Sequence, residues 1–174
     1  DQIMRIFLAL YFLSTTSVSL LVADEFNFRH ENVLGTSMEI SIVTDGAQSA
    51  EKVESLTLLE IDRLGSVFSS HDSASELSQW QRSTKDERVS QDLAEVLRQA
   101  EIWRSRSDGA FDVRASTTAQ SSAITLREAP YRVADDNLVT RYDRQPITLD
   151  AIAKGYILDS VCIMVKERFG NVSD

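Results

Sequence analysis

Residues 150–156 spell "DAIAKGY", the stretch that carries most of the information about this chain. A single lysine, Lys154, stands beside Gly155 in a run that is otherwise small and apolar. From residue 152 to residue 169 the apolar residues cover most of the helical circumference, which predicts a helix buried on several sides. Gly170 is a suitable residue just past its end. In the plainest interpretation, Lys154 extends from a buried helix into water.

A strand and an amphipathic helix are predicted upstream of this stretch. Met38, Ile40 and Ile42 alternate with polar residues, which is the two-residue period of a strand. A turn follows at residues 44–46. A helix then begins at Ser49, and its apolar residues share one face. These residues are Val53, Leu56, Leu64 and Val67, with Ile61 beside them.

A second helix is predicted from Ser90, a good N-terminal cap, with Asp92 in the first turn. Its apolar residues recur at helical spacing, at Leu93, Val96, Leu97 and Ala100. The sequence "SDGAFD" ends this helix, and residues 69–79 predict a polar loop or turn. Residues 131–151 predict short strands, the last running into the final helix. These elements together predict an α+β fold.

Composition and charge exclude several classes of function. The chain has 174 residues, of which 43% are hydrophobic and 26% charged, as in an ordinary globular domain. The net charge of −9 argues against nucleic acid as a partner. Cys162 is the single cysteine, so no internal disulfide can form, and its apolar surroundings predict a buried, inert thiol. His30 and His71 are the two histidines, too few for a zinc site built from His and Cys.

The N-terminal segment predicts export. Arg5 precedes an apolar run at residues 6–13, and the small residue Ala23 precedes Asp24, which is the pattern of a secretory signal peptide. A transmembrane anchor is the alternative, but the apolar run is short and "STTS" interrupts it. We therefore expect a signal peptide at residues 1–23, a mature domain at residues 24–174, and a location in the periplasm or cell envelope.

The C-terminal end raises a separate expectation. The sequence stops at "NVSD", directly after a helix whose apolar surface requires packing partners. We expect the 174 residues to be the N-terminal part of a longer protein.

Four stretches carry candidate chemistry: "ENVLGTSMEI" (31–40), "FSSHDSASELSQW" (68–80), "DGAFD" (108–112) and "ITLDAIAKGY" (147–156). Singly, they have structural interpretations as a turn, a solvated loop, a helix end and a lysine on a buried helix. Together and in this order, they resemble the FAD:protein FMN transferases, the ApbE-type flavin transferase family. The resemblance extends from about Glu31 to the end of the chain. It implies an ApbE-like α+β fold, a mixed sheet with packed helices, truncated at the C-terminus.

The last two motifs carry most of the resemblance. The family's Asp-Gly-Ala-Phe-Asp is identical at residues 108–112, and its Asp-Leu-Gly-Ala-Ile-Ala-Lys-Gly-Tyr is matched at residues 148–156. By this match Lys154 would face the pyrophosphate of FAD, where a helix N-terminus and a compact cation favour phosphate. The backbone carbonyl of Ala151 would bind Mg²⁺, a cation that takes oxygen ligands.

The resemblance also places residues at the flavin. Ala110, Phe111 and Asp112 match a segment that lines the isoalloxazine and ribose region. Leu34, which stands for the Met of a Met-Gly-Thr motif, and His71 match positions that pack against the flavin ring.

Besides Leu34, three residues depart from the family pattern. Thr148 replaces an Asp that contacts FAD, so a hydroxyl stands where a carboxylate would be. Asp150 replaces a Gly or Ser and would place a carboxylate near phosphate and metal, or cap the helix. Gln81 stands where an Asn is common. The resemblance puts the catalytic residues and the side-chain metal ligands beyond Asp174, so this chain alone is expected to be inactive.

The implied reaction is Mg²⁺-dependent transfer of FMN from FAD to a Thr or Ser hydroxyl of an acceptor protein, with release of AMP. The partners would be FAD and that acceptor protein, with no nucleic acid, and with a membrane only through the acceptor or an uncleaved N-terminus. One alternative is a pyrophosphatase that splits FAD to FMN and AMP. Others are a flavin-binding protein without catalysis and an unrelated exported structural domain.

Overall fold

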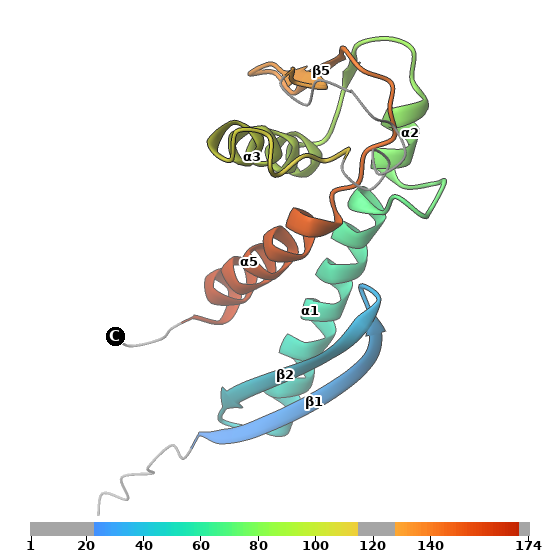
Figure 1. Ribbon diagram of the computed structural model, residues 1–174. Coiled ribbons are helices and arrows are strands. Elements are labelled where there is room, and N and C mark those ends of the chain that lie inside the picture. The colour runs from blue at the N-terminus through green and yellow to red at the C-terminus, as the bar shows by residue number, and fades with distance from the viewer. Residues whose placement is uncertain (1–22, 115–127, 171–174) are drawn as a thin grey trace, which may run out of the picture.

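The computed structural model describes residues 23–114 and 128–170, and Figure 1 shows how their elements are arranged. In chain order the elements are β1 (Asp24–Val33), β2 (Thr36–Thr44), α1 (Ala47–Phe68), α2 (Glu76–Arg82), β3 (Glu87–Arg88), α3 (Gln91–Arg106), β4 (Tyr131–Val133), β5 (Leu138–Arg141) and α5 (Asp150–Phe169). Within these residues the strands form an antiparallel β1–β2 hairpin and a three-stranded antiparallel sheet in the order β3-β5-β4. Helices packed with separate small sheets confirm the predicted α+β class.

The hairpin lies against α1 (Figure 1). Phe28 pairs with Ile40 and His30 with Met38, and these side chains are half-buried while the residues between them are exposed. The Nε2 atom of His30 lies 2.9 Å from a carboxylate oxygen of Glu54 on α1. The strand expected around residues 38–42 is confirmed as part of β2.

The core lies where the helices meet. Helix α1 begins at Ala47, close to the predicted Ser49, and α3 begins after Ser90, whose hydroxyl accepts the Leu93 N–H at 3.2 Å. The predicted apolar faces of both helices are buried, except that Leu56 is half-buried. The largest fully buried side chains include Ile61, Leu64, Leu77, Trp80, Leu93, Leu97, Leu149 and Ile157.

Helix α5 differs from the expectation of burial on several sides. It contacts α1 and α3, and its buried residues in this structure are Ala153, Ile157 and Val161. Other apolar residues stay in contact with solvent: Leu158 is 51% exposed and Ile163 58% exposed. Cys162 is also exposed, so the prediction of a buried thiol was wrong. The cause is that α1 and α3 cover one side of the helix, whereas the apolar residues extend around it.

Two other local predictions were wrong. The polar loop expected through residue 79 ends earlier, because α2 begins at Glu76 with Ser75 as its cap. The strand expected before α5 is an extended segment that joins no sheet, although Ile147 and Leu149 are buried on one side of it as in a strand. Gly170 ends α5 with φ −80°, not in the left-handed conformation, and a Cβ there would overlap the Lys166 carbonyl oxygen.

The expected signal peptide falls almost entirely on residues 1–22, outside the described residues. Within residues 23–114 and 128–170, none of the helices has the length and apolar character that crossing a lipid bilayer requires.

Candidate functional site

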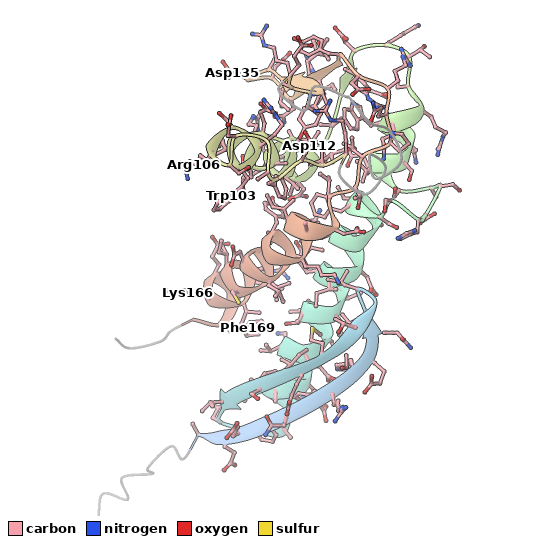
Figure 2. All side chains as sticks on the ribbon, in the orientation of Figure 1. Trp103, Arg106, Asp112, Asp135, Lys166 and Phe169 are labelled. Atoms are coloured by element: carbon pink, nitrogen blue, oxygen red, sulfur yellow. The ribbon has the colours of Figure 1, made fainter. Side chains whose placement is uncertain are left out.

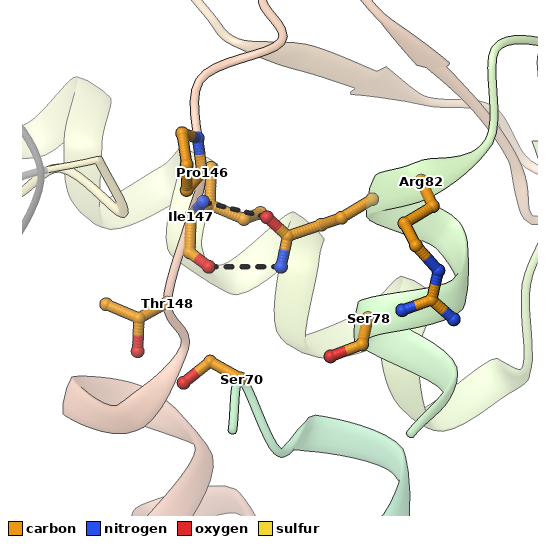
Figure 3. A pocket seen from close by; sticks show the side chains of 7 residues that line it. Ser70, Ser78, Arg82, Pro146, Ile147 and Thr148 are labelled. Carbon is orange, nitrogen blue, oxygen red and sulfur yellow. Dashed lines mark hydrogen bonds between the residues drawn. The ribbon is translucent and has the colours of Figure 1, made fainter. Parts of the chain in front are cut away.

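A polar pocket of about 320 Å³ lies between the end of α1, helix α2 and the segment that leads into α5 (Figure 3). Its lining combines hydroxyl groups, an amide and a guanidinium. The lining residues are Ser70, Ser78, Gln81, Arg82, Pro146, Ile147 and Thr148. Such a lining suits a ligand rich in hydrogen-bonding groups or negative charge.

The serine-rich loop forms one wall of the pocket. The Ser75 hydroxyl accepts the Ser78 N–H at 3.0 Å, which caps α2, and donates to the Ser69 carbonyl. The Ser78 hydroxyl donates to the same carbonyl at 3.3 Å. These bonds fold the loop back on α2 and place Ser70 and Ser78 at the pocket.

The opposite wall is the extended segment before α5. The side-chain amide of Gln81 donates to the Ile147 carbonyl at 3.2 Å and accepts the Ile147 N–H at 2.9 Å. The Thr148 N–H donates to the Val113 carbonyl at 2.9 Å, which links the residue directly after "DGAFD" to the segment two residues before "DAIAKGY". The Thr148 hydroxyl accepts the Asp150 N–H at 3.3 Å and lines the pocket.

The first turn of α5 presents small residues and one cation to solvent. Asp150, Ala151 and Lys154 are all exposed, and Lys154 has no hydrogen-bond or ion-pair partner among the described residues. A Cβ added at Gly155 would meet no atom within 4 Å. Residues 151 and 154, expected at metal and phosphate, are therefore open to a ligand.

The "DGAFD" stretch is a tight turn at the end of α3. Asp108 and Gly109 both have positive φ, 51° and 83°, a conformation that Gly tolerates and Asp adopts more readily than most residues. The Gly109 N–H donates to the Arg104 carbonyl at 2.9 Å, and the Phe111 N–H donates to the Ser107 hydroxyl at 2.9 Å. Ala110 is exposed and Phe111 is half-buried against the core.

The Asp112 carboxylate lies inside the fold (Figure 2) and is held by Arg114, to which it accepts two side-chain hydrogen bonds at 2.9 and 2.7 Å. Arg114 also donates to Asp143 at 2.8 Å. Burial alone would raise the pKa of Asp112, but the hydrogen bonds and charge of Arg114 hold that pKa below its usual value. What Asp112 can offer a ligand directly is therefore its main chain.

Leu34 occupies the turn of the hairpin. Leu34 and Gly35 have φ values of 50° and 76°, as a two-residue hairpin turn of type I′ requires. A leucine in this conformation is uncommon and costs free energy. Its Cδ2 atom lies 3.5 Å from the point where a Cβ on Gly65 of α1 would stand, an ordinary contact distance, so the turn lies close to α1 at Gly65.

His71 lies in the exposed loop after α1, and its main-chain N–H donates to the Ser69 hydroxyl at 3.2 Å. Of the predicted residues, Thr148 lines the pocket, and His71 directly follows Ser70, which also lines it. Sequence reasoning missed Arg82 as a pocket residue, and it undervalued Gln81. Their position directly after "SELSQW" was the available indication.

The described residues supply only some of the ligands that a Mg²⁺ ion requires. The Asp150 carboxylate and the Ala151 carbonyl are oxygen donors of the kind Mg²⁺ takes. In the part of the chain that the structure describes, no three His, Cys, Asp or Glu side chains gather as a metal site. Any Mg²⁺ here would need further ligands from outside the described residues.

Comparison with known proteins gives a consistent family match. The model of the ApbE family matches residues 34–171. No curated protein sequence matches the chain.

Solved structures resemble the fold. The flavin transferase ApbE from Vibrio cholerae superposes with a TM-score of 0.68 at 16% identity, covering 84% of this chain and 54% of that one. The apo flavinyl transferase ApbE from Pseudomonas stutzeri gives 0.69 at 15% identity, covering 85% and 55%. The ApbE protein from Thermotoga maritima gives 0.67 at 19% identity, covering 83% and 53%. The chain thus spans about half the length of the solved structures it matches.

Proposed function

This chain belongs to the ApbE family, and from that premise we propose that it supplies the FAD-facing part of an FAD:protein FMN transferase. In the proposed reaction a Thr or Ser hydroxyl oxygen of an acceptor protein attacks the phosphorus of the FMN moiety. The pyrophosphate bond breaks, AMP leaves, and the hydroxyl loses its proton. The family match supports flavin transfer, and the donor and leaving group are part of the proposal.

The observation that carries this proposal is the hydrogen bond from the Thr148 N–H to the Val113 carbonyl. It links Val113, directly after the "DGAFD" turn, to Thr148, two residues before α5, beside the pocket that Thr148 lines. This contact between segments far apart in the sequence supports a single site that would include both motifs.

We assign roles from accessibility and charge. Lys154 is exposed and unpaired among the described residues, and it binds the pyrophosphate. Residues 110–112 contact the flavin nucleotide through their main chain, since the Asp112 carboxylate is held by Arg114. Leu34 and His71 pack beside the flavin ring. Mg²⁺, with the Ala151 carbonyl among its ligands, supplies neutralisation of pyrophosphate charge.

We further propose that the protein acts outside the cytoplasm, after removal of residues 1–23, on an acceptor protein of the cell envelope. The motivation is the arginine, apolar run and small residue that precede Asp24. Mass spectrometry of the mature N-terminus tests this: cleavage after Ala23 is expected, and an intact N-terminus would contradict it.

Binding of FAD tests the proposed function. We expect the native-length protein to bind FAD with Mg²⁺ and to lose most of its affinity in EDTA, as calorimetric titration would measure. Unchanged affinity in EDTA would contradict a metal-bridged pyrophosphate.

Thr148, where the family has a carboxylate, favours one alternative, a flavin-binding protein without catalysis. AMP release and flavin-labelled acceptor protein separate the possibilities. Transferase activity gives both products, FAD hydrolysis gives AMP and free FMN, and simple binding gives neither.

A further inference from the structure

The side chain of Gln81 acts as a bridge between α2 and the segment that precedes α5. It makes two hydrogen bonds to one residue that lies 66 positions away, drawn as dashed lines in Figure 3. The amide nitrogen faces the Ile147 carbonyl, and the amide oxygen faces the Ile147 N–H. The reversed orientation would set donor against donor and acceptor against acceptor, so the amide has one favourable orientation.

The bridge replaces a strand partner. Ile147 is 4% exposed and Leu149 is fully buried, with the half-buried Thr148 between them. The Thr148 N–H is bonded to Val113, from the "DGAFD" side. The main chain at 147–148 is therefore bonded to Gln81 and to Val113, and an unpaired buried N–H or carbonyl here would be costly.

The α2 end of the bridge is itself fixed. Arg141 donates to the main-chain carbonyls of Gln81 at 2.7 Å and Gln145 at 2.8 Å. Its guanidinium lies 5.2 Å from the centre of the Trp80 ring. Trp80 is buried. Gln81 thus extends from a well-anchored helix end and can impose a position on Ile147.

We propose that Gln81 is a positioning residue of the flavin nucleotide site. It holds the main chain at Ile147, so that the Thr148 hydroxyl faces the pocket and the first turn of α5 is aimed at the ligand. Both of the bonds described go to Ile147, so Gln81 acts through that residue. The inference rests on the proposed function, because it is FAD that the positioned groups would bind.

The test compares Gln81→Met, which keeps length but removes both hydrogen bonds, with Gln79→Met on the same helix. Gln79 is exposed, and its side-chain amide donates to the nearby Ala74 carbonyl at 2.7 Å. In the native-length protein, Gln81→Met is expected to weaken FAD binding roughly tenfold, the effect of losing about one net hydrogen bond. It should also speed hydrogen exchange at the Ile147 and Thr148 amides. Gln79→Met should change neither quantity.

A destabilised control separates positioning from general stability. Ser90→Ala removes the cap of α3 and should lower the melting temperature without changing the FAD dissociation constant. If Gln81→Met does not fold, Gln81→Glu carries the test, because a carboxylate of the same length can still accept the Ile147 N–H but cannot donate to the Ile147 carbonyl.

Each outcome has a distinct meaning. Faster exchange at Ile147 with unchanged FAD affinity would overturn the positioning role. Weaker FAD binding in Ser90→Ala by the same factor would also overturn it, since stability alone would then explain the effect. Absence of FAD binding by the unchanged protein would instead contradict the proposed function.

Discussion

The guanidinium of Arg114 is 3% exposed and is shared by two carboxylates. Its pKa is raised, first by the hydrogen bonds to Asp112 and then by those to Asp143. A charge this deeply buried is stable only because it is paired. The network fixes residue 112, the last residue of the "DGAFD" turn, and therefore the turn itself.

Removing this guanidinium should be strongly destabilising. Arg114→Met leaves the buried Asp112 carboxylate without its partner, which costs about 3–5 kcal/mol of the free energy of unfolding. Urea denaturation measures this, with the exposed Arg106→Met as a matched control that should change stability by less than about 0.5 kcal/mol. Equal midpoints for the two variants would contradict the network's role.

The same network predicts an acid-sensitive fold. The pKa values of Asp112 and Asp143 are lowered in the folded state, despite the opposing effect of burial, mainly by hydrogen bonds from Arg114. Their contribution is therefore complete above the unfolded carboxyl pKa of about 4 and is lost as the pH falls through the lower folded values. Unfolding free energies measured from pH 6 down to pH 2 should decline below about pH 4. The decline should be weaker in Asp143→Asn.

Substitution of Lys154 is the most direct test of how the proposed site binds the pyrophosphate of FAD. Lys154→Ala should weaken FAD affinity roughly ten- to hundredfold, the effect of a charge-assisted hydrogen bond worth about 1.5–3 kcal/mol. Its melting temperature should stay nearly the same, because the side chain is exposed. Lys166→Ala, at the other end of α5, is the control (Figure 2). An unchanged dissociation constant would leave Lys154 as a simple solvated lysine.

At the scale of the elements, three helices meet at one carboxylate. Asp92 on α3 accepts a hydrogen bond from Arg63 of α1 at 2.7 Å and from the Tyr156 hydroxyl of α5 at 2.9 Å. The Tyr156 ring also packs edge-on against Phe68, with 5.6 Å between the ring centres. Burial, followed by the bond to Asp92, raises the pKa of Tyr156 to about 12. The tyrosine of "DAIAKGY" therefore docks α5 on the other two helices.

Tyr156→Phe isolates that hydroxyl, since the ring contact with Phe68 remains. We expect a loss of about 1 kcal/mol in the free energy of unfolding, because a half-buried hydrogen bond is lost while Asp92 keeps Arg63. The exposed Tyr142→Phe should be neutral. A neutral Tyr156→Phe would indicate that packing alone docks α5.

Helices with strong periodicity could be predicted from the sequence, and those without it could not. The apolar faces of α1 and α3 and the cap at Ser90 were apparent because each depends on local spacing. Helix α2 has seven residues, too few for a period, and its cap at Ser75 resembled a loop. The segment at Ile147 has strand-like burial but bonds a glutamine side chain, a long-range contact that no local pattern reveals.

At the scale of the whole molecule, the site is only partly assembled from described residues. Motif order predicted Leu34, His71, Thr148 and Lys154 as site residues, and of these four Thr148 lines the pocket. Asp112 was matched to a segment at the flavin region, and its carboxylate is held by an arginine two residues away. A motif match identifies residues but does not show which of their atoms are free to bind a ligand. The pairing of Asp112 with Arg114 could therefore be found only in the three-dimensional structure.

We expect the 174-residue chain by itself to show neither FMN transfer nor FAD hydrolysis. It spans about half of the solved ApbE structures, and its described residues hold no cluster of side-chain metal ligands. Incubation of the purified chain with FAD, Mg²⁺ and an acceptor protein, followed by assay for AMP, checks this. Release of AMP above a no-protein blank would refute it.

The amide of Gln81 recognises main-chain atoms, which every residue except proline would present at position 147. Descendants of this gene can exchange Ile147 for another apolar residue with no compensating change at position 81. Residues 81 and 147 are in contact, yet substitutions at the two positions should be uncorrelated. Position 147 has to remain apolar because it is buried, whereas position 81 needs a side-chain amide long enough to reach the main chain. Coevolution statistics would thus overlook a contact that a saturation mutagenesis screen at position 81 would reveal.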